Sequence, residues 1–451
     1  MKLDLTTGDI TKTMLRFAFP MMVGNMLQQL YNVADTLIVG RFLGAIALAA
    51  VGSAYTLMTF LTSIFLGLCM GSGAVFSIRY GERNTDQLKS SIFLSFVLIA
   101  AIAAILNVAV FLGIDGIMGF LRVPEEVYPM MREYLMIIFI GIVATFLYNY
   151  FASLLRAVGN SVAPLLFLGV SALLNIVLDL LFVLVFHWGV AGAAAATVVA
   201  QFVSGIGIMV YTLYCFPEFK PERRHMKWDK AVLKEITGFS VLTSLQQTVM
   251  NFGILMVQGL VNSFGPVVMA AFAAAVKIDS FAYMPVQDFG NAFSTFTAQN
   301  FGASKPERIE RGIKSAVKTT IVFCLMISAV VFLFAEPLMT IFVSPAEREI
   351  LAVGVGYLRI EGACYLGIGF LFLFYGYYRA VSKPGMSVVL TVISLGTRVL
   401  LAYTLSAVPA IGVIGIWAAV PIGWVLADLT GFIYYIHLKR KSGALYRTLR
   451  T

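Results

Sequence analysis

The sequence predicts an all-helical membrane protein, with twelve transmembrane helices in two six-helix lobes, and three observations support this fold class. The 451 residues are 60% apolar and only 12% charged, with a mean hydropathy of +0.89, whereas soluble domains carry about 25% charged residues. Uncharged stretches such as 91–114 and 399–427 exceed the roughly 20 apolar residues that cross a bilayer. These stretches are hydrophobic all round rather than at alternate positions, which favours helices over an outer-membrane barrel.

The spans follow one another along the chain with short polar breaks. The first ~12 residues are polar and the first apolar run is too long for a signal peptide, so we interpret that run as a true span. We expect twelve spans, near residues 14–42, 51–79, 89–113, 130–153, 163–186, 191–216, 233–262, 268–298, 310–335, 350–378, 386–407 and 412–437.

Basic residues fall in alternate inter-span regions. Twenty-five of the 32 Lys and Arg residues lie at the two termini and in the loops of one side, and the other side holds only Arg41, Arg122, Arg132 and Arg348. By the positive-inside rule both termini are cytoplasmic, which is expected of a multi-pass protein of a bacterial or archaeal inner membrane. The net charge of +9 therefore reflects topology and does not indicate a nucleic-acid partner.

The chain also repeats itself. Arg156-Ala157-Val158 recurs as Arg379-Ala380-Val381, and Gly189-Val190-Ala191-Gly192 recurs as Gly412-Val413-Ile414-Gly415, each 223 residues later. Leu27-Gln28-Gln29 recurs as Leu245-Gln246-Gln247, and Gly81 recurs as Gly302. We expect lobes at 1–216 and 233–438, a charged cytoplasmic linker at 217–232 and a basic tail at 439–451. Parallel repeats of this kind usually enclose a substrate site, which indicates an alternating-access transporter.

Catalytic and cofactor motifs are missing from the sequence. No Gly-Lys dipeptide occurs, so a phosphate-binding Walker A loop is excluded and an ion gradient is the expected energy source. The three histidines lie at span ends or in the linker, and the four cysteines lack ligand spacing. We therefore expect neither an enzyme nor a resident cofactor.

Ionisable residues within spans are informative because each costs about 2.5–3.5 kcal/mol at the centre of a membrane helix. Asp35 ends a polar stripe on one face of the first span, formed by Asn25, Gln28, Asn32 and Asp35. Asn175 and Asp179 share a face of the fifth span, and Thr197 on the sixth could add a hydroxyl. This set of hard oxygen ligands could hold Na⁺, or a proton on a buried carboxyl.

The second half differs from the first. Its first helix keeps an amide stripe (Gln247, Asn251, Gln258 and Asn262) without an acid in the position of Asp35. Asp288 lies in a further polar stripe and is either a cavity residue or a structural partner. Asp279 or Glu361 could neutralise Lys277 or Arg398. Across the spans, six acids (Asp35, Asp179, Asp279, Asp288, Glu361 and Asp428) stand against three bases, which favours cationic cargo.

Several strings make the sequence resemble the multidrug and toxic compound extrusion (MATE) transporters. They are Pro20, Tyr31 to Thr36 with Val39 to Gly44, the Arg156 to Asn160 turn, the Asn175 and Asp179 pair, and Gln299 to Ala303. The resemblance implies a V-shaped pair of lobes around a central cleft and antiport of drugs or cations. It also implies coupling to H⁺ or Na⁺ at Asp35, Asn175, Asp179 and Thr197, with Gln28 and Tyr31 lining the same lobe. The acid that another branch of the family carries on the seventh span is missing here.

The sequence thus predicts a monomeric secondary-active antiporter that exports amphipathic or cationic organic compounds in exchange for H⁺ or Na⁺. The residues expected to line its cargo cavity are Gln28, Tyr31, Asn32, Gln247, Asn251, Gln258, Asn262 and Asp288. A flippase for lipid-linked precursors, from the same wider superfamily, is the main alternative. An intramembrane enzyme is a second, disfavoured by the absence of a nucleophile–base or metal set.

Overall fold

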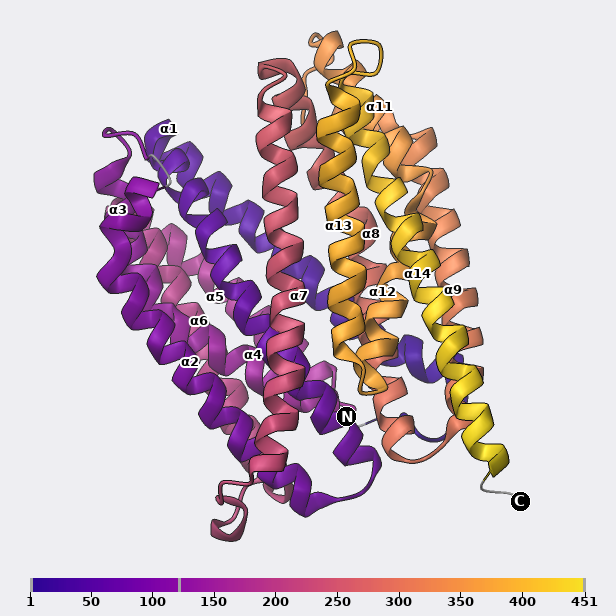
Figure 1. The fold of residues 1–451 in the computed structure, drawn as a ribbon. Coiled ribbons are helices and arrows are strands. Elements are labelled where there is room, and N and C mark those ends of the chain that lie inside the picture. Colours follow the sequence, from indigo (N-terminus) through magenta and orange to yellow (C-terminus); the bar gives the residue numbers. More distant parts are fainter. Residues whose placement is uncertain (1–2, 121–122, 449–451) are drawn as a thin grey trace. The chain divides into compact units, whose positions relative to one another are not determined.

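The computed structural model describes residues 3–120 and 123–448, except for the side chains of residues 45, 56, 120, 255 and 441–448. The described chain is helical throughout, without a strand (Figure 1). Most of the predicted basic tail lies outside the described part of the chain, which leaves out Arg450 and the side chains of Lys441 and Arg447. Two other basic residues, Lys2 and Arg122, also lie outside it.

The first half contains six long helices. They are α1 (Ile10–Gly81), α2 (Thr85–Phe120), α3 (Tyr128–Ile138), α4 (Ile142–Ala157), α5 (Val162–Asp179) and α6 (Gly189–Cys215). α1 holds two of the expected spans, which meet at Gly44, where φ is 86° and ψ is −177°. Glycine suits this position because a side chain would be strained at a positive φ. α1 keeps helical dihedral angles at Pro20.

The second half contains α7 (Lys230–Asn262), α8 (Pro266–Gly302), α9 (Pro306–Leu333), the short α10 (Ala335–Met339), α11 (Arg348–Gly362), α12 (Tyr365–Ala380), α13 (Pro384–Ser406) and α14 (Val413–Thr448). α11 and α12 together cover the expected tenth span but are bent by 51° at the break between them. In the first half, one expected span is also made of two helices: α3 and α4 are joined by a 3₁₀ turn, Phe139–Gly141, and together are long enough to cross a membrane.

Nine described helices are long and apolar enough to cross a membrane, and the bent pair α11–α12 makes a tenth. The two other expected spans correspond to residues 10–43 of α1 and to α7, whose amide stripes lower their apolar character. Both have more than 30 residues and rise about 1.5 Å per residue, so they exceed the ~30 Å of a bilayer core. The predicted all-helical membrane fold is confirmed, and the helices are consistent with twelve spans.

The chain forms two compact units, each with its own hydrophobic core. The first comprises residues 1–247 and 298–306, and the second comprises 248–297 and 307–451. Aromatic side chains such as Tyr150 and Phe139 fill the first core, and Tyr357 and Trp417 pack edge to face in the second. The lobe and linker boundaries expected from the sequence stay a prediction.

Within the first unit, the repeated glycines lie at a reciprocal backbone contact. A methyl group on Gly81 would strike the carbonyl oxygen of Gln299, and one on Gly302 would strike that of Ile78. Each contacted residue lies three positions before the glycine of its own helix, so the ends of α1 and α8 pack on each other in the same way. The repeat seen in the sequence is therefore also a repeat in packing.

The segment before α1 is fastened to the same end of the first unit. The amide of Leu3 donates to the carbonyl of Gly159 at 2.9 Å, where Gly159 has a φ of +88°. Asn300 Nδ2 donates to the carbonyl of Leu5 at 3.1 Å, and Lys305 Nζ donates to that of Thr6 at 2.8 Å. The side chain of Leu5 is fully buried. Two motifs singled out in the sequence, around Gly159 and Asn300, thus hold the amino-terminal segment.

Candidate functional site

α5 supplies the central pair of the candidate site. Asn175 and Asp179 lie four residues apart on one face of this helix and are both buried. Immediately after Asp179 the backbone widens into a π-helical stretch, Leu180–Val185. Such stretches are rare in proteins as a whole, but they occur often at functional sites. They shift the register of the side chains around them.

Asn175 is joined to α6 through Thr197. Asn175 Nδ2 donates to Thr197 Oγ1 at 3.2 Å, and that hydroxyl donates its own proton to the carbonyl of Ala193 at 3.1 Å. The Oδ1 atom of Asn175 is buried without a partner among the described residues. The pair therefore presents an unused amide oxygen and a hydroxyl lone pair, both of which can accept a proton donor or coordinate a hard cation.

Asp35 from α1 reaches Asp179 from α5. The two carboxyl groups are within hydrogen-bonding reach of each other. In the described part of the chain, no donor satisfies Asp35 Oδ1 or either side-chain oxygen of Asp179. Because ionised carboxylates only accept, they can bond to each other only when one of them carries a proton. Two carboxyl groups in this arrangement can share one proton or accept a cation between them.

Two tyrosines adjoin these carboxyl groups. Tyr134 of α3 is buried and lies within electrostatic reach of Asp35, Asp179 and Tyr31, and Tyr31 hydrogen-bonds to Gln28. Tyr31 and Gln28 were expected near this site, but Tyr134 was missed. A tyrosine within a span carries little insertion cost, so its position in the sequence did not distinguish it from a core residue.

The side chains expected to line a cargo cavity are divided between the two units. Gln28, Tyr31, Asn32 and Gln247 belong to the first, and Asn251, Gln258, Asn262 and Asp288 to the second. Asn32 Nδ2 donates to Gln29 Oε1 at 3.2 Å. Gln258 Nε2 donates to Asn262 Oδ1 at 2.8 Å, which confines two members of the second amide stripe to one side of α7. Asp288 is 1% exposed.

The second unit holds a separate acidic cluster. Asp279 of α8 and Glu361 of α11 are both buried and within electrostatic reach of Arg398 of α13. The hydroxyl of Tyr357 makes a long hydrogen bond, 3.5 Å, to Asp279 Oδ2. Lys277 instead lies 5.9 Å from the ring centre of Phe342. The sequence left open which base these acids neutralise, and of the two candidates Arg398 is the one whose charge influences both acids.

A conventional metal centre is not formed by the described residues, where no group of three or more His, Cys, Asp or Glu side chains is placed to hold a metal ion. An ion at the first-unit site would instead be held by a mixed set of carboxyl, amide and hydroxyl oxygens. Such ligands are those of an alkali or alkaline-earth cation rather than of zinc.

Comparisons with known proteins point to one family. The MatE family model matches residues 20–181 and 240–404. The chain is 30% identical to the "Probable multidrug resistance protein YpnP" of Bacillus subtilis over 98% of both proteins. It is 26% identical to the "FAD transporter" of Shewanella oneidensis over 96% of this chain and 95% of that one. A solved structure described as MATE in the bent conformation has the same fold, with a TM-score of 0.91, 24% identity, and coverage of 99% of this chain and 98% of that one.

Proposed function

This chain belongs to the MatE family of multidrug efflux transporters, and from this premise we propose that it is a secondary-active antiporter. It exports amphipathic or cationic organic compounds from the cell in exchange for inward H⁺ or Na⁺. It works in the cell membrane as a monomer, without a resident cofactor.

The observation that carries the proposal is the Asp35 and Asp179 pair. Two carboxylates held together in a membrane helix bundle repel each other, and each is costly to bury in ionised form. Uptake of one H⁺ or Na⁺ removes most of this penalty. The unit is therefore stable with the ion bound and under strain without it, which is the property that a coupling site requires.

Asn175 and Thr197 make the site sensitive to the position of α6. Their hydrogen bond joins α5 to α6, and the π-helical stretch after Asp179 lies next to it. An ion that draws the oxygens of Asp179 and Asn175 together changes the packing of α5 between α1 and α6. Ion binding and cargo binding are then linked through the shape of the first unit, and each must weaken the other by the same factor.

The cargo is proposed from charge and surface chemistry. Six acids and three bases within the expected spans favour cationic molecules, and the two amide stripes offer hydrogen bonds that suit varied polar groups. A lipid-linked precursor would carry phosphates and would call for a basic cavity. Because one relative is described as an FAD transporter, FAD belongs in the ligand panel beside organic cations.

The test is transport by purified protein in liposomes. Asp35→Asn should abolish uptake of a fluorescent organic cation into inverted vesicles under an imposed H⁺ or Na⁺ gradient, while expression and stability in detergent stay near wild type. Asp115→Asn is the matched control, because Asp115 is an exposed acid that pairs with Arg132 at 2.9 Å outside the site. Pumping by Asp35→Asn at the wild-type rate would refute the coupling role.

A further inference from the structure

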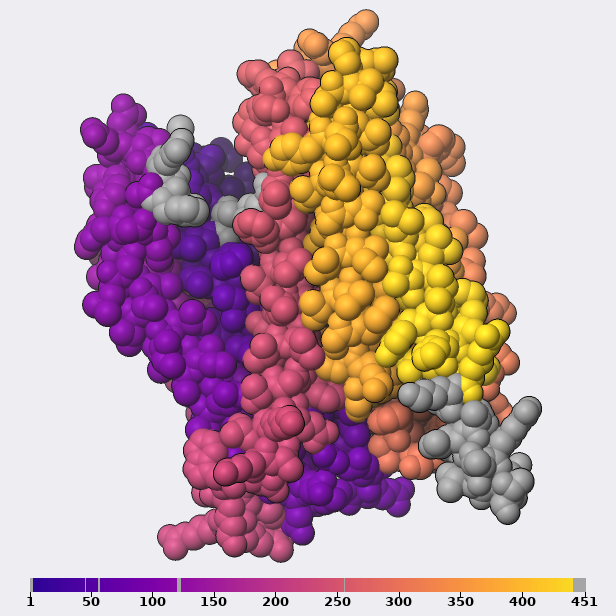
Figure 2. All heavy atoms as spheres, in the orientation of Figure 1, coloured from indigo at the N-terminus to yellow at the C-terminus, as the bar shows by residue number. Residues whose placement is uncertain are grey.

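The linker between α6 and α7 has a defined structure. It contains two short 3₁₀ turns, Pro217–Phe219 and Arg223–His225. The ring of Phe219 is buried and stacks on Phe216, with 6.0 Å between the ring centres. In Figure 2 the linker forms the pink projection at the lower edge of the first unit, on the side where the α1–α2 loop lies in Figure 1.

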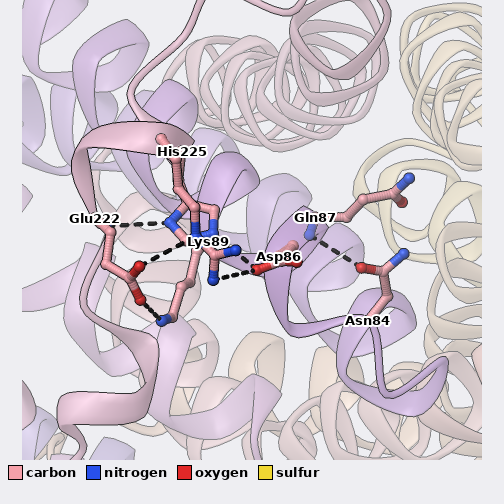
Figure 3. Close-up of polar contacts among 7 residues, drawn as sticks. Asn84, Asp86, Gln87, Lys89, Glu222 and His225 are labelled. Atoms are coloured by element: carbon pink, nitrogen blue, oxygen red, sulfur yellow. Dashed lines mark hydrogen bonds and ion pairs between the residues drawn. The ribbon is translucent and has the colours of Figure 1, made fainter.

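A polar clamp fixes this linker to the start of α2 (Figure 3). Lys89 Nζ pairs with Glu222 Oε1 at 2.6 Å. The amide of Glu222 donates to His225 Nδ1 at 3.1 Å, so the other ring nitrogen, Nε2, carries the proton and donates it to Asp86 Oδ1 at 2.9 Å. Arg224 also pairs with Asp86, at 3.1 Å.

The side chain of His225 is buried at 4% exposure, whereas the residues that follow it are exposed. Met226 is 45% exposed and Trp228 is 67% exposed. Lys227 between them is exposed, as are Lys220, Arg223 and Lys230. This exposed stretch therefore combines the indole of Trp228 and the thioether of Met226 with several exposed cationic side chains.

These residues stand next to the bilayer. The linker joins the end of α6 at Cys215, a helix long and apolar enough to cross a membrane, to the start of α7 at Lys230, which the sequence predicts to be a span. Its anchor point on α2 also lies at the beginning of a span, Thr85–Gly119. Indole side chains prefer the headgroup layer of a membrane, and basic side chains beside a span attract anionic headgroups. Together they form the two-part signal, apolar and electrostatic, of a peripheral membrane contact.

We propose that residues 217–230 bind the headgroups of anionic phospholipids in the leaflet next to them. Trp228 and Met226 enter the interfacial layer, and Lys220, Arg223, Lys227 and Lys230 face the lipid phosphates. The clamp around His225 holds the backbone in the shape that presents both groups at once. Each basic residue at an anionic surface contributes a factor of roughly five to association, and the contribution is screened by salt.

The test uses the full-length protein in nanodiscs and the fluorescence of Trp228. The contribution of this residue is the difference in emission between wild type and Trp228→Phe. In zwitterionic discs doped with phosphatidylglycerol, the bromine label is placed on the acyl chains of either the anionic or the zwitterionic lipid at equal mole fraction. We expect brominated phosphatidylglycerol to quench the Trp228 contribution at least several-fold more strongly, and high salt to remove this preference.

Two variants with equal loss of charge separate a specific surface from a general charge effect. Lys220→Gln/Lys227→Gln/Lys230→Gln should abolish the preference, whereas Arg311→Gln/Lys314→Gln/Lys318→Gln, on α9, should keep it. Asp86→Asn, which loosens the clamp without removing a basic residue, should reduce it. Equal quenching by both lipids, or equal loss in the two triple variants, would overturn the proposal. Absence of quenching by either lipid would also overturn it and would leave the surface to a soluble partner.

Discussion

Replacing Gly71 by alanine should loosen the first unit at the crossing of α1 and α7. Gly67 and Gly71 lie one turn apart on α1, facing Ser240 and Ser244 of α7, and this spacing of small residues lets two membrane helices approach closely. The hydroxyls of Ser72 and Ser240 are 2.8 Å apart at the crossing, and Ser244 Oγ donates to the carbonyl of Ile64 at 3.1 Å. The contact therefore combines packing with two hydrogen bonds.

The size of the effect follows from the space at Gly71. A methyl group there would lie 2.6 Å from Ser240 Cα, and real methyl contacts essentially never fall below 3.0 Å. Because the obstacle is backbone, the two helices must separate rather than rotate a side chain away. Overpacking of this kind costs about 1–3 kcal/mol, and the Ser72–Ser240 bond, worth ~0.6 kcal/mol in a membrane, is stretched as well. The higher helix propensity of alanine offsets at most about 1 kcal/mol of this loss of stability.

Gly238→Ala is the matched control, because Gly238 lies in the same stretch of α7 and a methyl group there would meet nothing within 4 Å. It should leave the thermal midpoint unchanged or raise it, whereas Gly71→Ala should lower it. The assay is thermal unfolding of both purified variants in one detergent, read by loss of monodisperse protein. A midpoint for Gly71→Ala equal to or above that of wild type would show that the crossing is not close-packed and would refute this reasoning.

Three further predictions concern the regions outside the spans. Gly159→Ala should release the amino-terminal segment and expose it to protease, because the left-handed backbone at Gly159 and the nearby carbonyl leave no room for a methyl group; unchanged cleavage would contradict this. A cysteine placed in 217–230 should react with an impermeant maleimide only after cells are opened, and one near Val123 should react in intact cells; the reverse pattern would overturn the topology. The hydrogen bond from Lys89 lowers the pKa of Glu222 below its ordinary 4.5, so the Lys89–Glu222 pair of the clamp is intact above about pH 4.5 and weakens as pH falls through the lowered pKa. Protease accessibility of the linker should rise over that acidic range in wild type and rise less in Glu222→Gln, where Asp86 is the one carboxylate of the clamp that still loses its charge.

The helical fold was predictable because hydrophobicity and charge act over whole spans. The pattern of basic loops and the length of apolar runs depend little on side-chain packing, so they can be read without a structure. The irregular points could not be read in this way. Gly44 joins two spans with a single non-helical residue, and the break between α11 and α12 follows Gly362, inside the expected tenth span. A glycine lies at each position, but residue spacing gives neither the φ of 86° at Gly44 nor the 51° bend after α11.

The residues expected at the candidate site could be named from the sequence, but the contacts between them could not. Asp35 and Asp179 stood out because a carboxyl group in a span is costly, and Asn175 shares a helical face with Asp179. Thr197 was expected at the site from its hydroxyl group and from the family resemblance, but the sequence shows neither its hydrogen bond to Asn175 nor the position of Tyr134 beside both acids. These relations join different helices, and residue spacing within one helix carries no information about them.

The most direct test of the central claim is the dependence of cargo affinity on pH and Na⁺ in two variants. Asp179 belongs to the proposed coupling site in the first unit, and Gln258 to the amide stripe in the second. We expect Asp179→Asn to bind an organic cation with measurable affinity that no longer responds to pH or Na⁺. We expect Gln258→Leu to change the preference among cargo molecules while keeping the full ion response. An unchanged ion response in Asp179→Asn, or its loss in Gln258→Leu, would contradict the assignment of coupling to the first unit.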